Sequence, residues 1–357
     1  MKKKIISIIT LVLIISMIFG GCVGKTEEET TTSTTATTTT EEVKPIYYNR
    51  LTGKSDLSPA AAGKRPVAVM INNIKASLPQ YGISSADILF EVLVEGGITR
   101  LMALYGDYTK VPKVCSVRSC RYYFPIFAHG FDAVYFCFGS NESLATPTLK
   151  RIGIDYFDGN QNGDSLVFGR DPDRLKKYSR EHTAYVNGAN ISELLKKYSV
   201  RTDYRDGKDV NVFNFRGEDA PKAAGTITAD TVKFNFSGYY YSTFAYNAKT
   251  KTYYKNHCAN AHMDSATNKQ LNFTNVFALE TDVHNYKGGK LIELDWTGGS
   301  GYYISMGKAQ KITWVKSTED SSIVCFDETG AELQVNPGKS YIGVINTGKT
   351  VISQATA

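Results

Sequence analysis

The chain has 357 residues, of which 42% are hydrophobic and 21% are charged, and its formal net charge is +6. The first 44 residues contain five lysines and five glutamates, so the remainder of the chain also carries +6. A positive charge this small on so long a chain does not indicate nucleic-acid binding. It suits a protein whose surface lies close to anionic lipid or wall polymer.

Residues 1–21 have the pattern of a secretory signal peptide. Three lysines at positions 2–4 precede an apolar run over 5–19, which is shorter than the ~20 residues of a membrane-spanning helix. Two glycines then precede Cys22, and this stretch resembles a bacterial lipobox, in which the cysteine becomes the first residue and its thiol receives diacylglycerol. We therefore predict a lipid anchor on Cys22 that holds the protein at the extracytoplasmic face of the cell membrane. An ordinary secreted protein is the alternative.

The stretch over 22–45 is predicted to be a tether. It is rich in threonine and glutamate, and between positions 25 and 43 its one sizeable apolar residue is Val43. Such a segment buries too little apolar surface to offset the entropy of ordering it, so we expect it to be disordered.

The rest of the chain is long enough for two domains, with a break in the polar, turn-prone stretch over 216–226. We predict an α+β protein in which an α/β layered domain over 46–216 precedes a mostly-β domain over 226–357. In the first domain Ser84, an acidic first turn and a glycine stop indicate a helix over 84–97. The expected elements are strands over 65–72, 99–107 and 132–139 and helices over 84–97, 140–153 and 190–199.

The second domain reads as strands almost throughout. Polar and aromatic positions alternate within short runs, and Gly, Asn and Asp separate these runs at hairpin spacing. This pattern predicts a sandwich or an open barrel. The expected strands lie within 231–247, 275–283, 290–296, 301–307, 310–316 and 339–346.

Stretches along most of the chain resemble, in the same order, the YerB family of bacterial lipoproteins. The resemblance implies a tethered envelope lipoprotein whose N-terminal and C-terminal domains have no known function. The family's "GPVRSARPYF" differs here by Cys115-Ser116 for Gly-Pro, Cys120 for Ala and Tyr122 for Pro. The matching stretches are 65–107, "VRSCRYYF" at 117–124, "FDAVYFCFGS" at 131–140, "REHTAYVN" at 180–187, 246–279, 299–316 and 326–346.

Arg118 and Arg121 are the centre of the predicted binding site. If a helix begins near residue 117, both guanidinium groups lie on one face of its first turns, beside backbone N–H groups that favour a carboxylate or phosphate. The alternative is an internal ion-pair network. In that case Glu91 and Glu95, four apart on the predicted helix over 84–97, pair with these arginines or with Arg100.

Residues at the ends of the predicted strands extend this site. In α/β sheets ligands collect beyond the carboxyl ends of the strands, which here are Asn72-Asn73, Asp107 and Gly139-Ser140. Ser140, after a glycine and before a helix, resembles a small anion-cradling turn. Further candidates, charged or titratable, are Arg170, Asp171, Arg174 and His182, although the family's Pro-His-Asn is Glu181-His182-Thr183 here.

The second domain offers ligand types for a metal but no matching spacing. His257, Cys258, His262 and Asp264 lie close together, yet they form neither a helical His-x-x-x-His site nor a paired Cys-x-x-Cys. We therefore predict no metal, and expect His262 and Asp264 to be a hydrogen-bonded pair that shapes a hairpin or pocket.

The cysteines do not define a disulfide framework. With Cys22 lipidated, an odd number is left: Cys115, Cys120, Cys137, Cys258 and Cys325. Cys137 lies in an apolar run and is expected in the core. Cys115 and Cys120 could form a bridge only if the backbone between them is not helical, and the pattern leaves this open.

No reaction can be written from the sequence, because no nucleophile has an evident base and no phosphate-binding loop is present. We predict a non-catalytic envelope module without a cofactor, which binds an anionic wall polymer or an envelope protein. The alternative is a wall-polymer hydrolase or lyase. In that case Glu91 or Glu95 and His182 or His262 are the acid–base groups.

Overall fold

The computed structural model describes residues 46–208 and 210–354. The predicted signal peptide, the lipidation site Cys22 and the tether over 22–45 lie outside these residues. Within them, no helix combines the length and the apolar character that crossing a bilayer requires.

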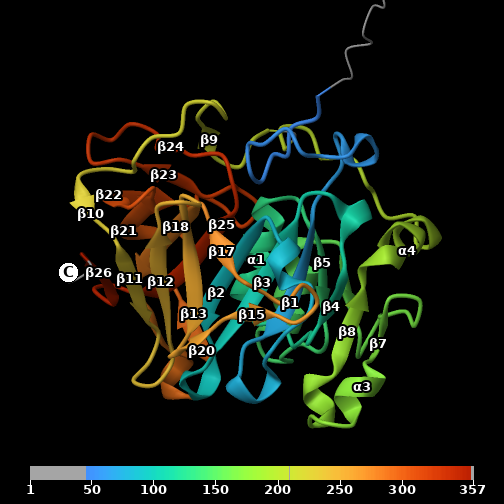
Figure 1. Cartoon of the computed structure of the whole chain (residues 1–357). Coiled ribbons are helices and arrows are strands. Elements are labelled where there is room, and N and C mark those ends of the chain that lie inside the picture. Colours follow the sequence, from blue (N-terminus) through green and yellow to red (C-terminus); the bar gives the residue numbers. More distant parts are fainter. Residues whose placement is uncertain (1–45, 209, 355–357) are drawn as a thin grey trace, which may run out of the picture. The chain divides into compact units, whose positions relative to one another are not determined.

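One sheet of eleven strands runs through both predicted domains (Figure 1). Strand β25 from the C-terminal part pairs in parallel with β2 from the N-terminal part, and this pairing joins the two parts. The order is β10 (Ile227–Thr228), β22 (Lys308–Val315), β21 (Gly298–Ser305), β18 (Asn275–Thr281), β25 (Ser340–Asn346), β2 (Ile88–Leu93), β3 (Thr99–Tyr105), β1 (Val67–Asn72), β5 (Val134–Cys137) and β6 (Tyr156–Asp158), with β23 (Val324–Phe326) beside β22.

A second sheet packs on the C-terminal half of the large sheet. Phe234 and Phe244 of the second sheet share a core with Val276 and Ile304 of the large sheet. The C-terminal part is therefore mostly β, with two sheets face to face, as expected from the alternating pattern. The second sheet contains β14 (Asn260–Ala261), β13 (Thr252–His257), β12 (Tyr241–Asn247), β11 (Thr231–Asn235), β26 (Thr350–Ser353) and β17 (Asn272–Phe273).

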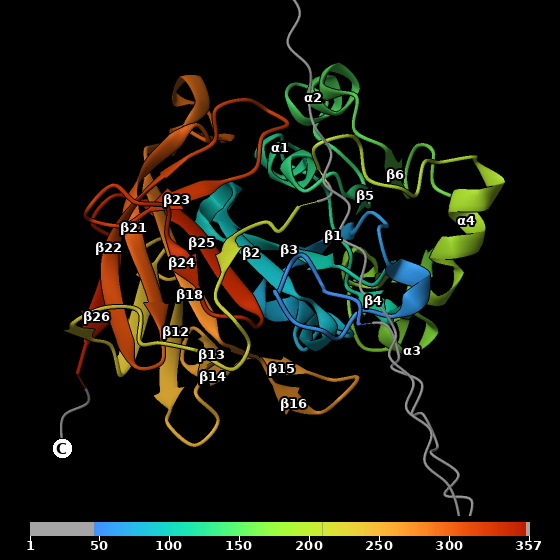
Figure 2. The ribbon, with the colours of Figure 1, turned by 90° about the horizontal axis from the view of Figure 1, so that it is seen from above.

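Helices and a small sheet cover the N-terminal half, giving the expected layered arrangement (Figure 2). Helices α1 (Tyr123–Gly130) and α2 (Ala145–Ile152) pack on one face through Phe127 and Leu149. Helix α4 (Ile191–Lys197) packs on the other face through Leu194. The remaining elements are α3 (Pro172–Leu175), the sheet of β4 (Lys113–Cys115), β8 (Ala184–Asn187) and β7 (Phe168–Arg170), and the pairs β15 (Met263–Asp264) with β16 (Lys269–Gln270), β19 (Val283–Asn285) with β20 (Ile292–Leu294), and β9 (Asn214–Phe215) with β24 (Gln334–Val335).

The predicted helix over 84–97 is wrong. Residues 88–93 form strand β2, and all but the last of them are buried. A strand that is covered on both faces is apolar without alternation, so periodicity does not distinguish it from a buried helix. The serine signal at 84 belongs to a short 3-10 turn over Ile83–Ser85, and the glycine stop at Gly96 and Gly97 is a tight turn between β2 and β3.

The predicted helix start near residue 117 is also wrong, because α1 begins at Tyr123. Pro125 fits the first turn of a helix that begins there, whereas it would break the interior of a helix that began at 117. The backbone of the preceding loop bonds instead to β1 and to the loop after β5: the N–H of Arg118 donates to the carbonyl of Met70 (3.2 Å) and the N–H of Cys120 donates to that of Gly139 (2.9 Å).

Candidate functional site

The sheet topology decides which strand ends meet. Strands β1 and β5 are parallel, so Asn72 and the loop after Cys137 lie at the same edge of the sheet. Strand β3 runs antiparallel to β1 and places Arg100 opposite Asn72. The end of β3 and Asp107 are consequently at the opposite edge, so the expectation that Asp107 extends this site is wrong.

Arg100 and Arg121 come together at this edge. Arg100 is 7% exposed and donates to the carbonyl of Ser119 at 2.5 Å. Burial and the charge of Arg121 lower the pKa of Arg100 to about 10. Arg121 donates from Nε to Glu95 at 2.5 Å, and both of these side chains are partly exposed. Glu95 therefore makes the arginine contact expected under the ion-pair alternative.

Arg118 lies in the loop between β4 and α1, which also contains Arg121. Its guanidinium contacts Glu181 at 2.8 Å, and 29% of the side chain is exposed. Beside it, Arg170 stacks over the ring of Phe138 at 4.3 Å and donates to the carbonyl of Arg180 at 2.7 Å. Burial and the charges of Arg180 and Arg118 lower the pKa of Arg170.

These arginines outnumber their acidic partners. Arg180 is exposed, and no carboxylate of the described residues pairs with its guanidinium. Of the five guanidinium groups at this edge, two pair with a carboxylate of the described residues, Arg118 with Glu181 and Arg121 with Glu95. We name the group the arginine rim: Arg100, Arg118, Arg121, Arg170 and Arg180.

The other predicted residues at this edge are structural. The backbone N–H of Gly139 already donates to Asp158 at 2.6 Å, and the Ser140 hydroxyl contacts that of Thr146 at 2.7 Å, so the turn does not present these groups to an anion. Arg174 is 1% exposed and donates to three backbone carbonyls, those of Ser77, Pro79 and His182. Asp171 caps α3 through the N–H groups of Asp173 and Arg174.

His182 connects the arginine rim to β1. It is 5% exposed, its Nδ1 lies 3.0 Å from the side-chain amide of Asn72, and burial lowers its pKa despite the nearby Glu181. Asn72 and Asn73 are adjacent in the chain and point to different surroundings. Asn72 faces His182, whereas Asn73 donates to Glu91 at 3.1 Å.

Glu91 does not pair with any of the arginines. It is 1% exposed, and its carboxylate lies 3.2 Å from the ammonium of Lys255. Burial opposes ionisation of Glu91, but the charge of Lys255 and the donated hydrogen bonds outweigh it and lower the pKa of Glu91. The remaining donors are Asn73 (3.1 Å), Thr99 (2.8 Å), Ser242 (2.8 Å) and Tyr341 (2.9 Å).

Lys255 is fully buried and its hydrogen-bonding capacity is met. Its ammonium contacts Ser242 at 2.8 Å and Nδ1 of His262 at 3.0 Å, while Nε2 of His262 lies 3.0 Å from the side-chain oxygen of Gln80. Burial and the charge of Lys255 lower the pKa of His257 to about 4 and that of His262 well below its usual value. We name this group, an ion pair with neutral histidines, the Glu91 cluster: Asn73, Gln80, Glu91, Thr99, Ser242, Lys255, His257, His262 and Tyr341.

The expected pairing of His262 with Asp264 is wrong. Asp264 accepts from the backbone of Gly82 (3.0 Å) and from both the backbone and the hydroxyl of Ser84 (2.7 and 2.6 Å). Both residues therefore hold the loop over 80–84 to the stretch over 262–264, which leads into and includes β15. No three His, Cys, Asp or Glu side chains of the described residues are placed to hold a metal ion.

The cysteines in the described part of the chain are buried free thiols, including Cys115 and Cys120. Burial raises the pKa of Cys115 and of Cys325 to about 12. A thiol with so high a pKa forms little thiolate at neutral pH, so neither group is a prepared nucleophile.

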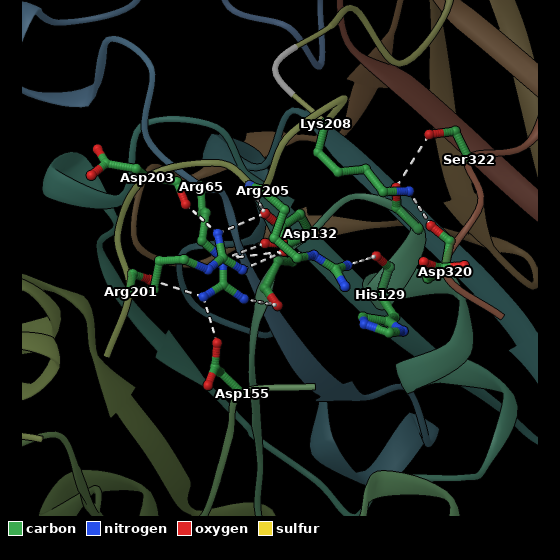
Figure 3. A network of polar contacts seen from close by, with 12 residues as sticks. Arg65, His129, Asp132, Asp155, Arg201, Asp203, Arg205, Lys208, Asp320 and Ser322 are labelled. Carbon is green, nitrogen blue, oxygen red and sulfur yellow. Dashed lines mark hydrogen bonds and ion pairs between the residues drawn. The ribbon is translucent and has the colours of Figure 1, made fainter. Parts of the chain in front are cut away.

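A second group of arginines, which the sequence analysis missed, differs from the arginine rim (Figure 3). Arg201 and Arg205 contact the buried carboxylate of Asp132 at 2.7 and 2.9 Å. Arg65 lies 3.5 Å from the same carboxylate and 2.5 Å from that of Asp155. Each of these three arginines therefore contacts the one buried carboxylate of Asp132, which lies between them. Their wide separation in the chain left no pattern that could have identified the group.

Comparison with known proteins places the chain in a family. Residues 51–201 match the N-terminal domain, and residues 231–342 the C-terminal domain, of the family described as protein of unknown function (DUF3048). The chain belongs to this family. Neither family description assigns a binding or catalytic role.

The relatives confirm the YerB resemblance. The chain is 29% identical over 287 residues to "Putative lipoprotein YerB" of Bacillus subtilis, covering 79% of this chain and 81% of the relative. The crystal structure of B. subtilis YerB matches with a TM-score of 0.72 at 24% identity, covering 86% of this chain and 99% of that one. The structural match supports the fold, and the relative's name supports a membrane-associated, lipid-anchored protein.

Proposed function

We propose that the protein is a lipid-anchored module on the extracytoplasmic face of the membrane, where its arginine rim binds an anionic component of the cell wall. The observation that carries the proposal is the ratio of five guanidinium groups to two carboxylate partners at one edge of the sheet. An arginine fork matches the geometry of a phosphate or carboxylate, and unbalanced positive charge attracts such a group.

Arg118 and Arg180 are the groups that a ligand reaches first. Arg180 is exposed, and Arg118 is 29% exposed while holding only the half-exposed Glu181. Exposed ion pairs contribute about 0–1 kcal/mol, so an anion can displace Glu181 at little cost. Arg100 and Arg121 lie deeper and supply positive potential behind them.

The test measures binding of a soluble polymer of phosphodiester-linked polyol units by titration calorimetry at low salt. The double variant Arg118→Gln/Arg180→Gln is expected to bind about tenfold or more weakly, since a hydrogen bond to a charged group contributes about 1.5–3 kcal/mol. Lys176→Gln is the matched control, because this lysine is 71% exposed and lies just after α3.

Thermal unfolding of the same variants separates binding from folding. The proposal expects weaker binding of the double variant at an unchanged midpoint. Equal binding by the wild type, the double variant and the control would assign the arginines to internal ion pairs alone. Binding of an acidic envelope protein instead of the polymer would retain the rim and change the class of partner.

The hydrolase or lyase alternative has less support. Glu91 and His262 are buried in the Glu91 cluster with their hydrogen bonds met, and His182 is 5% exposed. Release of small fragments from the wall polymer during incubation with the protein would favour the alternative.

A further inference from the structure

An apolar patch lies where the described chain begins. Ile46, Tyr48 and Val210 are 63%, 58% and 54% exposed. The N–H of Val212 donates to the carbonyl of Arg50 at 3.1 Å, which brings the stretch over 210–215 alongside 48–53. Single exposed apolar residues are ordinary on a protein surface, whereas several in one place mark a contact surface. We name Ile46, Tyr48 and Val210 the N-terminal apolar patch.

The surface around the patch is hollowed on two sides. One groove of about 340 Å³ is lined by Ile46, Tyr48 and Asn211 among others. A second groove of about 580 Å³ is lined by Tyr48, Asn211 and Phe215 among others. Neither groove contains a residue of the arginine rim, so the patch and the rim are separate surfaces.

The length of chain before the patch indicates what covers it. Cys22 and Pro45 are 23 residues apart, and a chain of this length spans at most about 80 Å. An anchor on Cys22 therefore keeps the membrane surface within that distance, which corresponds to an effective concentration on the order of 1 mM. At such a concentration a weak contact is occupied much of the time. Isoleucine and tyrosine suit the boundary between headgroups and acyl chains, where a tyrosine ring has an apolar side and a wet side.

We propose that the N-terminal apolar patch rests on the lipid surface of the membrane, and that this contact turns the arginine rim toward the wall. The described chain begins at one side of the molecule, whereas β7, which ends at Arg170, and the following α3 lie toward the opposite side (Figure 1). This inference rests on the lipid anchor of the proposed function. It adds an orientation that the anchor alone does not provide.

Tyr239 provides a matched control for Tyr48. It is 56% exposed, close to the 58% of Tyr48. Its hydroxyl donates to the carbonyl of Gly96, just after β2 and at the same edge of the sheet as Arg100. The two tyrosines are therefore equally accessible, but Tyr239 is on the side of the arginine rim.

The experiment uses the full-length lipidated protein in vesicles of phosphatidylglycerol and phosphatidylcholine with brominated acyl chains, which quench indole fluorescence at short range. Tyr48→Trp and Tyr239→Trp are compared with the unsubstituted protein, which gives the background from Trp296 and Trp314. We expect quenching of the indole introduced at position 48, several-fold greater than at position 239. Adding Ile46→Ser and Val210→Ser to Tyr48→Trp should reduce that quenching.

Each other outcome contradicts the inference in a distinct way. Protein that floats with the vesicles but shows equal or no quenching at the two positions has an anchor without a fixed orientation. Protein that does not float lacks the anchor, and both the anchor and the orientation are then wrong. Anion binding by the arginine rim is measured in solution without vesicles, so its failure is distinguishable from either result.

Discussion

The arginine rim and the Glu91 cluster lie close together and show two uses of buried or half-buried charge. Two neighbouring residues of the chain link them: Asn72 contacts His182 beside the arginine rim, and Asn73 donates to Glu91 in the cluster. In the cluster one carboxylate and one ammonium are sealed, and their hydrogen bonds are met. In the rim two of the five guanidinium groups pair with a carboxylate, and Arg118 and Arg180 are accessible to solvent. The buried ion pair of Glu91 and Lys255 holds the two parts of the chain together, whereas the accessible arginines of the rim can bind an anionic ligand.

The largest expected effect is the loss of stability when the ion pair of the Glu91 cluster is removed. Glu91→Gln leaves the ammonium of Lys255 buried without its counter-ion, and we expect unfolding free energy to fall by about 3–5 kcal/mol. Glu95→Gln is the comparison in the rim, and it should cost about 0–1 kcal/mol because its partner is partly exposed. Urea unfolding measures both.

The double variant Glu91→Gln/Lys255→Met sharpens this result. Because it removes both charges, it should lose less stability than the sum of the two single variants. If Glu91→Gln proved as mild as Glu95→Gln, the cluster would not hold the two parts of the chain together.

A smaller effect follows from the neutral histidines of the cluster. His257 has a pKa of about 4 in the folded protein, against about 6.5 when unfolded. Between these values the unfolded state binds more protons, so stability that is present at pH 7 decreases as the pH falls from about 6.5 to 4. One such histidine accounts for about 3 kcal/mol over this window.

The pH dependence is checked by urea unfolding between pH 7 and pH 4. His257→Gln should flatten the loss of stability, whereas His284→Gln, at a side chain that is 50% exposed, should leave the slope of the wild type. Parallel slopes for the wild type and His257→Gln would show that His257 is not held neutral by its burial.

The smallest expected effect concerns Glu181, which competes with a ligand for Arg118. Glu181→Gln should tighten binding of the phosphodiester polymer a few-fold and change stability by about 0–1 kcal/mol, because the ion pair is exposed. Asp173→Asn, at a side chain that is 78% exposed, controls for the general loss of a negative charge. Equal gains in both variants would indicate long-range charge instead of a specific site.

The strands with clear alternation could be predicted from the sequence, and so could the mostly-β C-terminal part. Strand β2 could not be predicted, because it is buried on both faces and its sequence therefore lacks the alternation of polar and apolar residues that identifies a strand. The pairing of β25 with β2 joins positions about 250 residues apart along the chain, beyond the reach of local patterns.

The arginine rim was partly predictable and the Glu91 cluster was mostly missed. Arg100, Arg118 and Arg121 were identified from charge and spacing, but Arg180 was not. Lys255 had a usable signal: it alternates with Tyr253 and His257 along β13, and all three are buried. A lysine on the apolar face of a strand requires a buried partner. Its partner Glu91 could be recognised only from the fold.

The most direct test of the account is a structure of the protein with a short phosphodiester oligomer bound. We expect a phosphate group between Arg118 and Arg180, with Glu181 displaced from Arg118 and the Glu91 cluster unchanged. An oligomer bound at another surface, with the Arg118–Glu181 contact intact, would contradict the proposal that the arginine rim is the binding site.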